Sequence, residues 1–227
     1  MHSIRDSKLK TLNCDAVVFD FDGTLAKLNI DFSMMRNSVM ELLLSYGVHM
    51  DGLRSLFVLE MIEEGKVILD KNQPAKGEEF FRRACNLIRD IEIEGARRGE
   101  LIKGIKEMLF ELKARRVKIG IATRNCSEAV MEVFPDISSF CHTVVTREST
   151  RSVKPHPEHL LTVLRNLGVK AGTSAMVGDH PMDIRIGKEA GTLTVGVLTG
   201  YSGADALAEA GADLIIKSAA DIIHHLP

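Results

Sequence analysis

The chain has 227 residues, 45% of them apolar, and 29 basic against 31 acidic residues give a formal charge of −2. This composition is that of an average globular protein and excludes a disordered, collagen-like or coiled-coil chain. The near-zero charge argues against nucleic-acid binding, and no apolar run reaches the ~18 residues of a membrane helix. The length corresponds to about one and a half ordinary domains.

Two further features concern location. The four cysteines show no C-x-x-C spacing, which favours reduced structural thiols over a zinc site or a redox motif. The N-terminus is basic, but the apolar run that follows at 16–19 ends at Asp20 and is too short for a signal peptide. We therefore expect a cytoplasmic protein without a membrane partner.

The first predicted element is a buried strand at 15–19, a short Val-rich run. Helical patterns follow without a strand between them, at 32–46, 53–69 and 78–93. Glycines and a proline separate these patterns. Residues 27–98 are therefore expected to form a bundle of three or four helices.

Strands and helices alternate from about residue 99 onward. Strands are predicted at 117–122, 143–145, 174–177, 193–197 and 213–216, and helices at 105–115, 128–134, 157–167, 184–190, 204–210 and in the tail. The alternation predicts an α/β fold with a mostly parallel sheet. Because the sheet begins before the helical block and resumes after it, we assign 1–26 and 99–227 to one domain and 27–98 to an insertion.

Polar residues follow the predicted strands at their carboxyl ends. They are Asp20, Asp22 and Gly23 after the first strand, Thr123 and Arg124 after the second, Lys154 beyond the third, and Asp179 and Asp183 after the fourth. In open α/β sheets, binding sites form at this edge. We therefore expect acids, a hydroxyl and an amine to converge on one rim of the sheet.

The chemistry of this set points to phosphoryl transfer. Crowded carboxylates repel one another unless a cation lies among them, and all-oxygen ligands suit Mg²⁺. A lysine and a threonine hydroxyl can bind phosphoryl oxygens. One aspartate can attack phosphorus while a second acts as general acid and base.

Four motifs resemble those of the haloacid dehalogenase-like hydrolase superfamily. They are Asp-Phe-Asp-Gly-Thr-Leu at 20–25, Thr123, Lys154 followed by Pro155, and Gly-Asp-His-Pro-Met-Asp at 178–183. The resemblance covers nearly the whole chain. It implies a Rossmann-like core with a helical cap inserted after the first strand.

The resemblance also implies roles. Asp20 is expected to be the nucleophile, Asp22 the acid and base that also ligates the metal through its carbonyl, and Asp183 a support for the metal's waters or for Lys154. The residues assigned to phosphate or substrate are Gly23, Thr123, Arg124 and Lys154, and those assigned to Mg²⁺ are Asp20, Asp22, Asp179 and Asp183.

The carboxylate at Asp22 favours phosphates over haloacids, since dehalogenases of this superfamily lack it. The chain most resembles phosphoglycolate phosphatases and related hydrolases of small phosphorylated metabolites, with the cap as a lid over the substrate. Lys27 and Arg124 depart from the pattern of many relatives, which puts phosphoglycolate itself in doubt. The alternatives are a mutase of the β-phosphoglucomutase type, an inorganic pyrophosphatase, or a non-catalytic binding protein on the same fold.

Several single residues admit more than one interpretation. Arg124 could bind a substrate anion or be a solvated basic residue, and Asp183 could be a carboxylate on a helix face. His180 could contact substrate or the metal's shell, whereas His159 is expected to be a helix residue. A monomer and a homodimer are both compatible with the sequence.

Overall fold

The computed structural model describes residues 12–49, 51–71 and 73–227. It divides into two compact units. One is Asn29–Arg98, which we call the insertion, and the other comprises the residues before and after it, which we call the core unit. The α/β fold with a helical insertion is confirmed.

The core unit contains a six-stranded, fully parallel sheet in the order β5-β4-β1-β6-β7-β8. The strands are β1 (Ala16–Phe19), β4 (Lys118–Ala122), β5 (Thr143–Val145), β6 (Ser174–Gly178), β7 (Leu193–Val197) and β8 (Leu214–Ile216). Every residue of β1 is buried, as its unbroken apolar run predicts for a strand covered on both faces.

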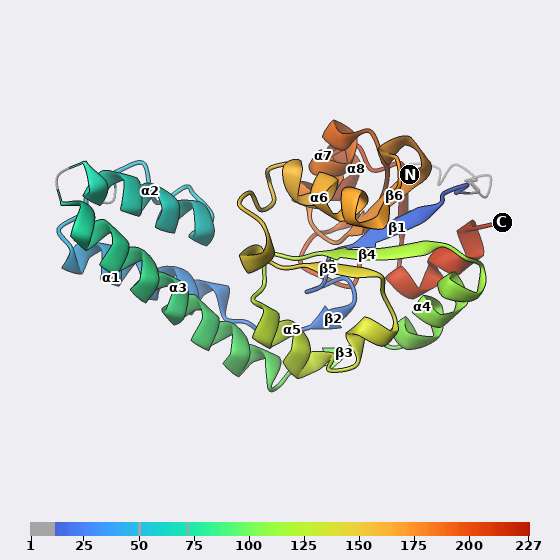
Figure 1. Cartoon of the computed structure of the whole chain (residues 1–227), viewed down its shortest axis with the longest axis horizontal. Helices are drawn as coiled ribbons and strands as arrows, with labels where there is room; N and C mark the ends of the chain where they lie inside the picture. The colour runs from blue at the N-terminus through green and yellow to red at the C-terminus, as the bar shows by residue number, and fades with distance from the viewer. Residues whose placement is uncertain (1–11, 50, 72) are drawn as a thin grey trace, which may run out of the picture. The chain divides into compact units, whose positions relative to one another are not determined.

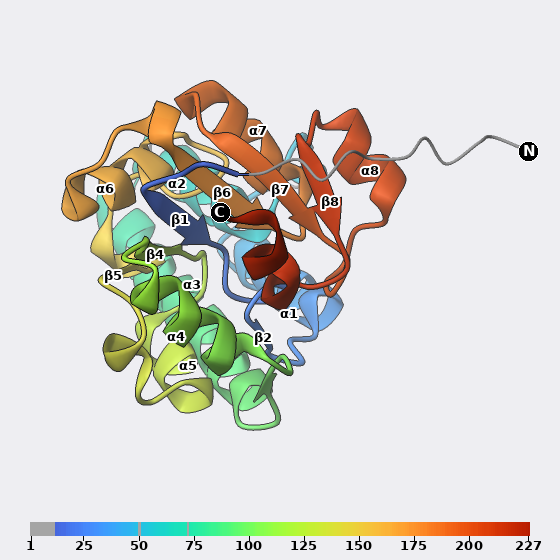
Figure 2. The same ribbon diagram turned by 90° about the vertical axis from the view of Figure 1, so that its right-hand side faces the viewer.

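Helices cover both faces of this sheet (Figures 1 and 2). The α-helices of the core unit are α4 (Ile105–Ala114), α5 (Ser127–Val133), α6 (Glu158–Leu167), α7 (Pro181–Ala190) and α8 (Ala204–Glu209), and the 3₁₀ turns are η1 (Ile137–Ser139), η2 (Arg147–Ser149), η3 (Ala171–Thr173) and η4 (Ala219–His225). The helices α6, α7 and α8 lie on one face, and α4 and η4 on the other. The predicted helical tail is thus the 3₁₀ turn η4.

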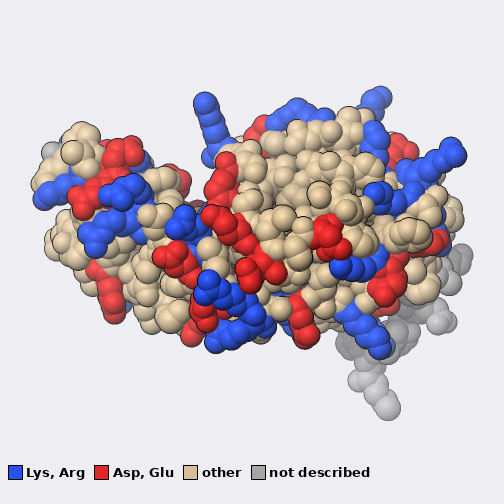
Figure 3. Space-filling view, turned by 60° about the horizontal axis from the view of Figure 1, so that its bottom comes forward, with Lys and Arg blue, Asp and Glu red and all other residues tan. Residues whose placement is uncertain are grey.

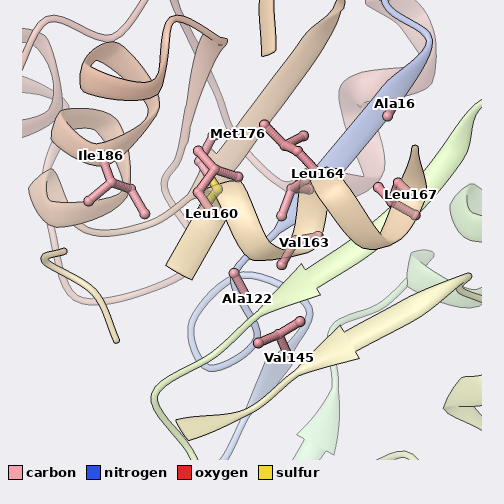
Figure 4. Close-up of a cluster of buried hydrophobic side chains, with 10 residues drawn as sticks. Ala16, Ala122, Val145, Leu160, Val163, Leu164, Leu167, Met176 and Ile186 are labelled. Carbon is pink, nitrogen blue, oxygen red and sulfur yellow. The ribbon is translucent and has the colours of Figure 1, made fainter. Parts of the chain in front are cut away.

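The apolar face of α6 fills the space above the central strands (Figure 4). Leu160, Val163 and Leu164 recur at helical spacing and pack against residues of β1, β4, β5 and β6. Gly168 ends the helix in a left-handed conformation with φ of 63°, as expected for a glycine after the last helical residue. This packing fixes the sheet whose carboxyl edge carries the polar residues.

A short antiparallel ribbon, β2 (Ala26–Lys27) with β3 (Glu100–Leu101), joins the two chain segments at the base of the insertion. This ribbon was not predicted from the sequence, because two-residue strands are too short to show an alternating pattern. Lys27 is opposite Glu100 in this ribbon.

The described residues of the insertion form three helices: α1 (Phe32–Ser45), α2 (Val58–Asp70) and α3 (Pro74–Ala96). The helix α2 begins five residues later than predicted, because the residues after Gly52 form turns. Gly65 of α2 lies so close to Leu43 and Phe80 that a Cβ there would be 2.4 Å from the Leu43 side chain. The small residue therefore lets the three helices pack tightly.

No helix in the described part of the chain is long and apolar enough to cross a membrane. Acidic and basic side chains are interspersed over the face shown in Figure 3, in keeping with the formal charge of −2.

Candidate active site

Three neighbouring strands of the sheet each end in a residue of the predicted site. Asp20, Thr123 and Asp179 directly follow β1, β4 and β6. The Asp20 amide donates to the carbonyl of Val177 (2.9 Å), and the Thr123 amide to that of Val145 (3.0 Å). These bonds extend the ladder past the strands, so the backbone of both residues is as fixed as the sheet itself.

Lys154 lies between two carboxylates. Its ammonium Nζ is 2.7 Å from Oδ1 of Asp20 and 2.8 Å from Oδ1 of Asp183, and only 2% of Lys154 is exposed. Burial alone would lower the pKa of Lys154, but the two carboxylates outweigh it and hold the pKa above its usual value. Lys154 is therefore a permanent positive charge.

Asp179 is enclosed from several sides. Its Oδ2 accepts from the Tyr201 amide at 2.9 Å, and its Oδ1 accepts from the Thr24 hydroxyl at 3.4 Å. A Cβ at Gly23 would be 2.6 Å from Oδ2 of Asp179, and one at Gly200 would be 1.9 Å away. Two glycines thus leave the space that this carboxylate occupies.

Burial, followed by the negative charges of Asp20 and Asp183, raises the pKa of Asp179 to about 7. The pKa of Asp183 rises to about 6, chiefly through burial, although the Lys154 ammonium opposes the change. Both pKa values are raised because negative charges are crowded into a site with little water. A bound cation would reduce this repulsion.

The carboxylates of Asp20, Asp179 and Asp183 fit a divalent cation. Each offers an oxygen, and these oxygens lie within 4.8 Å of one another. With Lys154, three carboxylates and one ammonium carry a formal charge of −2 when all are ionised. An all-oxygen donor set of this charge suits Mg²⁺ better than a softer metal.

Asp183 is held by the start of α7. Its Oδ2 accepts from the His180 amide (3.3 Å), while Nδ1 of His180 accepts from the Met182 amide (3.1 Å). This reciprocal capping satisfies backbone donors at the helix start and turns the other oxygen of Asp183 toward Lys154. The structure thus gives the His180 ring a capping contact, and Asp183 is a buried carboxylate of the site, not a carboxylate on an exposed helix face.

The Asp22 carboxylate makes separate contacts. Its Oδ1 accepts from the Leu28 amide at 2.9 Å, and the Tyr201 hydroxyl donates to its Oδ2 at 3.4 Å. Gly23 follows with φ of +83°, a conformation that glycine adopts without strain. The turn therefore gives Asp20 and Asp22 different surroundings, although they are two residues apart.

Thr123 and Arg124 are both engaged with neighbouring groups. The buried Thr123 hydroxyl donates to Oδ1 of Asn125 (2.8 Å) and accepts from the Asn125 amide (3.1 Å). The Arg124 guanidinium donates to the Lys154 carbonyl and contacts the Met182 sulfur at 3.5 Å. Arg124 thus braces the loop that carries the buried lysine.

His159 braces the same loop from inside. Its Nδ1 accepts from the Lys154 amide (3.1 Å), so the proton is on Nε2, which lies 3.0 Å from the Val145 carbonyl. Burial and the Lys154 charge lower the pKa of His159 to about 4. His159 lies in α6, as the sequence predicted, and its hydrogen bond also anchors the Lys154 amide.

The loop after β7 also contributes to the site, although no sequence motif indicated it. The Thr199 hydroxyl donates to the Gly23 carbonyl (2.7 Å), and Gly200 and Tyr201 contact Asp179. The same rule that located the other residues, polar groups at the carboxyl end of a parallel strand, could have identified this loop.

The comparisons with known proteins agree with this architecture. The profile of the haloacid dehalogenase-like hydrolase family matches residues 17–197. A hydrolase from Pseudomonas syringae has a similar fold, with a TM-score of 0.68 at 20% identity over 93% of this chain and 97% of that one.

Three curated relatives differ in the substrate their names state. Pyrophosphatase PpaX of Bacillus velezensis is 34% identical over 53% of this chain but only 56% of its own length. A Clostridium perfringens protein provisionally named pyrophosphatase PpaX is 29% identical over 92% of this chain and 95% of its own length. Phosphoglycolate phosphatase of Salmonella choleraesuis is 31% identical over 70% of this chain and 64% of its own length.

Proposed function

The chain belongs to the haloacid dehalogenase-like hydrolase family, and from this premise we propose that it is a Mg²⁺-dependent phosphatase that hydrolyses a small phosphorylated metabolite through an aspartyl-phosphate. The observation that carries the proposal is the cluster of Asp20, Lys154, Asp179 and Asp183 at the carboxyl edge of the sheet, in which all but Asp20 are buried. It offers a nucleophile, a fixed positive charge and a cation site within one cluster.

The proposed metal ligands are the carboxylates of Asp20, Asp179 and Asp183, with the backbone carbonyl of Asp22. Mg²⁺ bound there would supply charge neutralisation and polarisation of the phosphoryl group. The Lys154 ammonium adds a second positive charge, and the Thr123 hydroxyl can turn its proton from Asn125 to a phosphoryl oxygen. Gly23 and Arg124 are proposed to complete the phosphate site.

In the first step, a carboxylate oxygen of Asp20 attacks phosphorus as the bond to the leaving oxygen breaks. Asp22 gives its proton to that oxygen, so the product departs as a neutral alcohol. In the second step, Asp22 takes a proton from water as the water oxygen attacks the aspartyl-phosphate. Phosphate leaves, and both carboxyl groups return to their starting states.

The comparisons support two substrate classes. The Salmonella relative favours a phosphomonoester such as phosphoglycolate, whereas the Clostridium relative, which aligns with almost the whole chain, favours pyrophosphate. We place the phosphomonoester first, and pyrophosphate is the second candidate.

A screen of phosphorylated metabolites with phosphate detection in Mg²⁺ tests the proposal, with phosphoglycolate and pyrophosphate included. We expect phosphate release from at least one substrate and its loss when EDTA removes Mg²⁺. Conversion of a sugar phosphate without phosphate release would favour a mutase. Absence of release from the whole panel would leave the non-catalytic binding protein as the better explanation.

A further inference from the structure

We propose that the Tyr201 hydroxyl is a positioning group for Asp22 and fixes that carboxyl for proton transfer to the leaving oxygen. The proposal rests on the function given above. It assigns a role to a loop that none of the sequence motifs includes.

The contacts of Asp22 are the starting point. Its two oxygens have different donors: the backbone amide of Leu28 at 2.9 Å and the side chain of Tyr201 at 3.4 Å. Each oxygen of the carboxylate thus accepts from a different donor, and two donors on opposite oxygens help to fix the plane of the group. Contacts of this kind are often long before substrate binds and tighten in the complex.

The loop itself is well placed to hold the phenol. The Tyr201 amide donates to Oδ2 of Asp179 (2.9 Å), and two residues earlier the Thr199 hydroxyl donates to the Gly23 carbonyl (2.7 Å). One short segment after β7 is therefore bonded to the turn that bears Asp22 and to Asp179, which follows β6. This double attachment explains how a tyrosine with 62% of its surface exposed can keep a defined position.

The phenol also remains a donor. A phenol ordinarily has a pKa of ~10, so the Tyr201 hydroxyl, 3.4 Å from Oδ2 of Asp22, carries a proton to donate at neutral pH. Asp22 is protonated before the first step and ionised between the two steps. A phenol can donate to an oxygen of either form, so it orients Asp22 without removing the proton that Asp22 transfers.

The role makes a distinctive prediction because substrates differ in their need for an acid. An alkoxide leaves only if the proton of Asp22 reaches the ester oxygen as the bond to phosphorus breaks, whereas p-nitrophenolate is a weak base and leaves without it. Removing the hydrogen bond that orients Asp22 should therefore slow the hydrolysis of alkyl phosphates more than that of p-nitrophenyl phosphate. A role in folding, or a contact to the phosphoryl group that both substrates share, would slow the two alike.

The test is Tyr201→Phe, which retains the ring and the amide bond to Asp179. We expect kcat/KM in saturating Mg²⁺ to fall about tenfold on the alkyl phosphate that the wild type hydrolyses best, the effect of losing one hydrogen bond to a charged group. On p-nitrophenyl phosphate it should fall less than about twofold. Thermal unfolding of both proteins verifies that the variant is folded.

The other tyrosine of the chain provides a matched control. The Tyr46 hydroxyl belongs to the insertion and donates to Glu79 (2.9 Å), so Tyr46→Phe removes a comparable hydrogen bond that does not involve Asp22 and should leave the ratio of the two substrates unchanged. Equal losses on both substrates in Tyr201→Phe would overturn the positioning role. A wild type that turns over neither substrate would instead overturn the proposed function, and the positioning role with it.

Discussion

Gly200 offers a direct way to displace Asp179 without changing any polar group. Its φ is not in the left-handed region, so alanine fits the backbone, but the added Cβ would be 1.9 Å from Oδ2 of Asp179. Real Cβ atoms essentially never lie closer than 3.0 Å to another heavy atom, so the Asp179 side chain or the Gly200 backbone must shift by about 1 Å. Gly200→Ala therefore perturbs the proposed metal site by a distance that the structure itself sets.

A shift of this size has a large expected effect. A displacement of about 1 Å near reacting groups can reduce the rate about 100-fold, and disturbing groups that orient a metal ligand lowers metal affinity about 10- to 100-fold. We expect isothermal titration calorimetry to show weaker Mg²⁺ binding by Gly200→Ala within that range. On p-nitrophenyl phosphate, kcat/KM should fall about 100-fold.

Gly203→Ala is the matched control, because it lies in the same loop and a Cβ there meets nothing within 4 Å. It should bind Mg²⁺ and turn over substrate like the wild type. If Gly200→Ala retained wild-type Mg²⁺ affinity while folded, Asp179 would not be a metal ligand held in place by this loop.

Two further predictions concern the loop that carries Lys154. His159 has a pKa of about 4 in the folded protein, below the ~6.5 of a free imidazole. Its contribution to the free energy of unfolding is therefore complete above pH ~6.5 and falls at lower pH, where the unfolded chain takes up a proton. Between pH 7.5 and 5, the urea unfolding free energy of the wild type should therefore fall by about 2 kcal/mol relative to His159→Gln, and a pH-independent difference would contradict the assignment. Arg124→Ala should lower kcat/KM about tenfold, because it removes a brace of this loop and a proposed phosphate contact, and Arg124→Lys should not restore it. Unchanged kcat/KM on every accepted substrate would leave Arg124 with neither role.

The parallel sheet could be predicted from the sequence because β1, and β4 after Lys118, are short stretches without polar side chains, each followed by a polar residue. The strand ends also predicted that Asp20, Lys154, Asp179 and Asp183 would meet, since parallel strands present their carboxyl ends at one edge. The ribbon of β2 and β3 could not be predicted, because its pairing joins residues more than 70 positions apart over only two residues each.

The contacts that hold the site together were harder to predict from the sequence. His159 makes a hydrogen bond to Lys154, and Tyr201 makes one to Asp22 and one to Asp179. Such hydrogen bonds depend on the tertiary structure, which no local sequence pattern indicates. The helices of the insertion were predictable as elements, but a helical pattern does not state which substrate a protein accepts.

The most direct test is to quench the enzyme in acid during turnover of p-nitrophenyl phosphate in Mg²⁺ and to locate any phosphoryl group by peptide mass spectrometry. We predict a phosphoryl group on the peptide that contains Asp20, more of it in Asp22→Asn, where release by water is slowed, and none in Asp20→Asn, which should also release no phosphate. Continued turnover by Asp20→Asn, or a phosphoryl group on another residue, would contradict the aspartyl-phosphate mechanism.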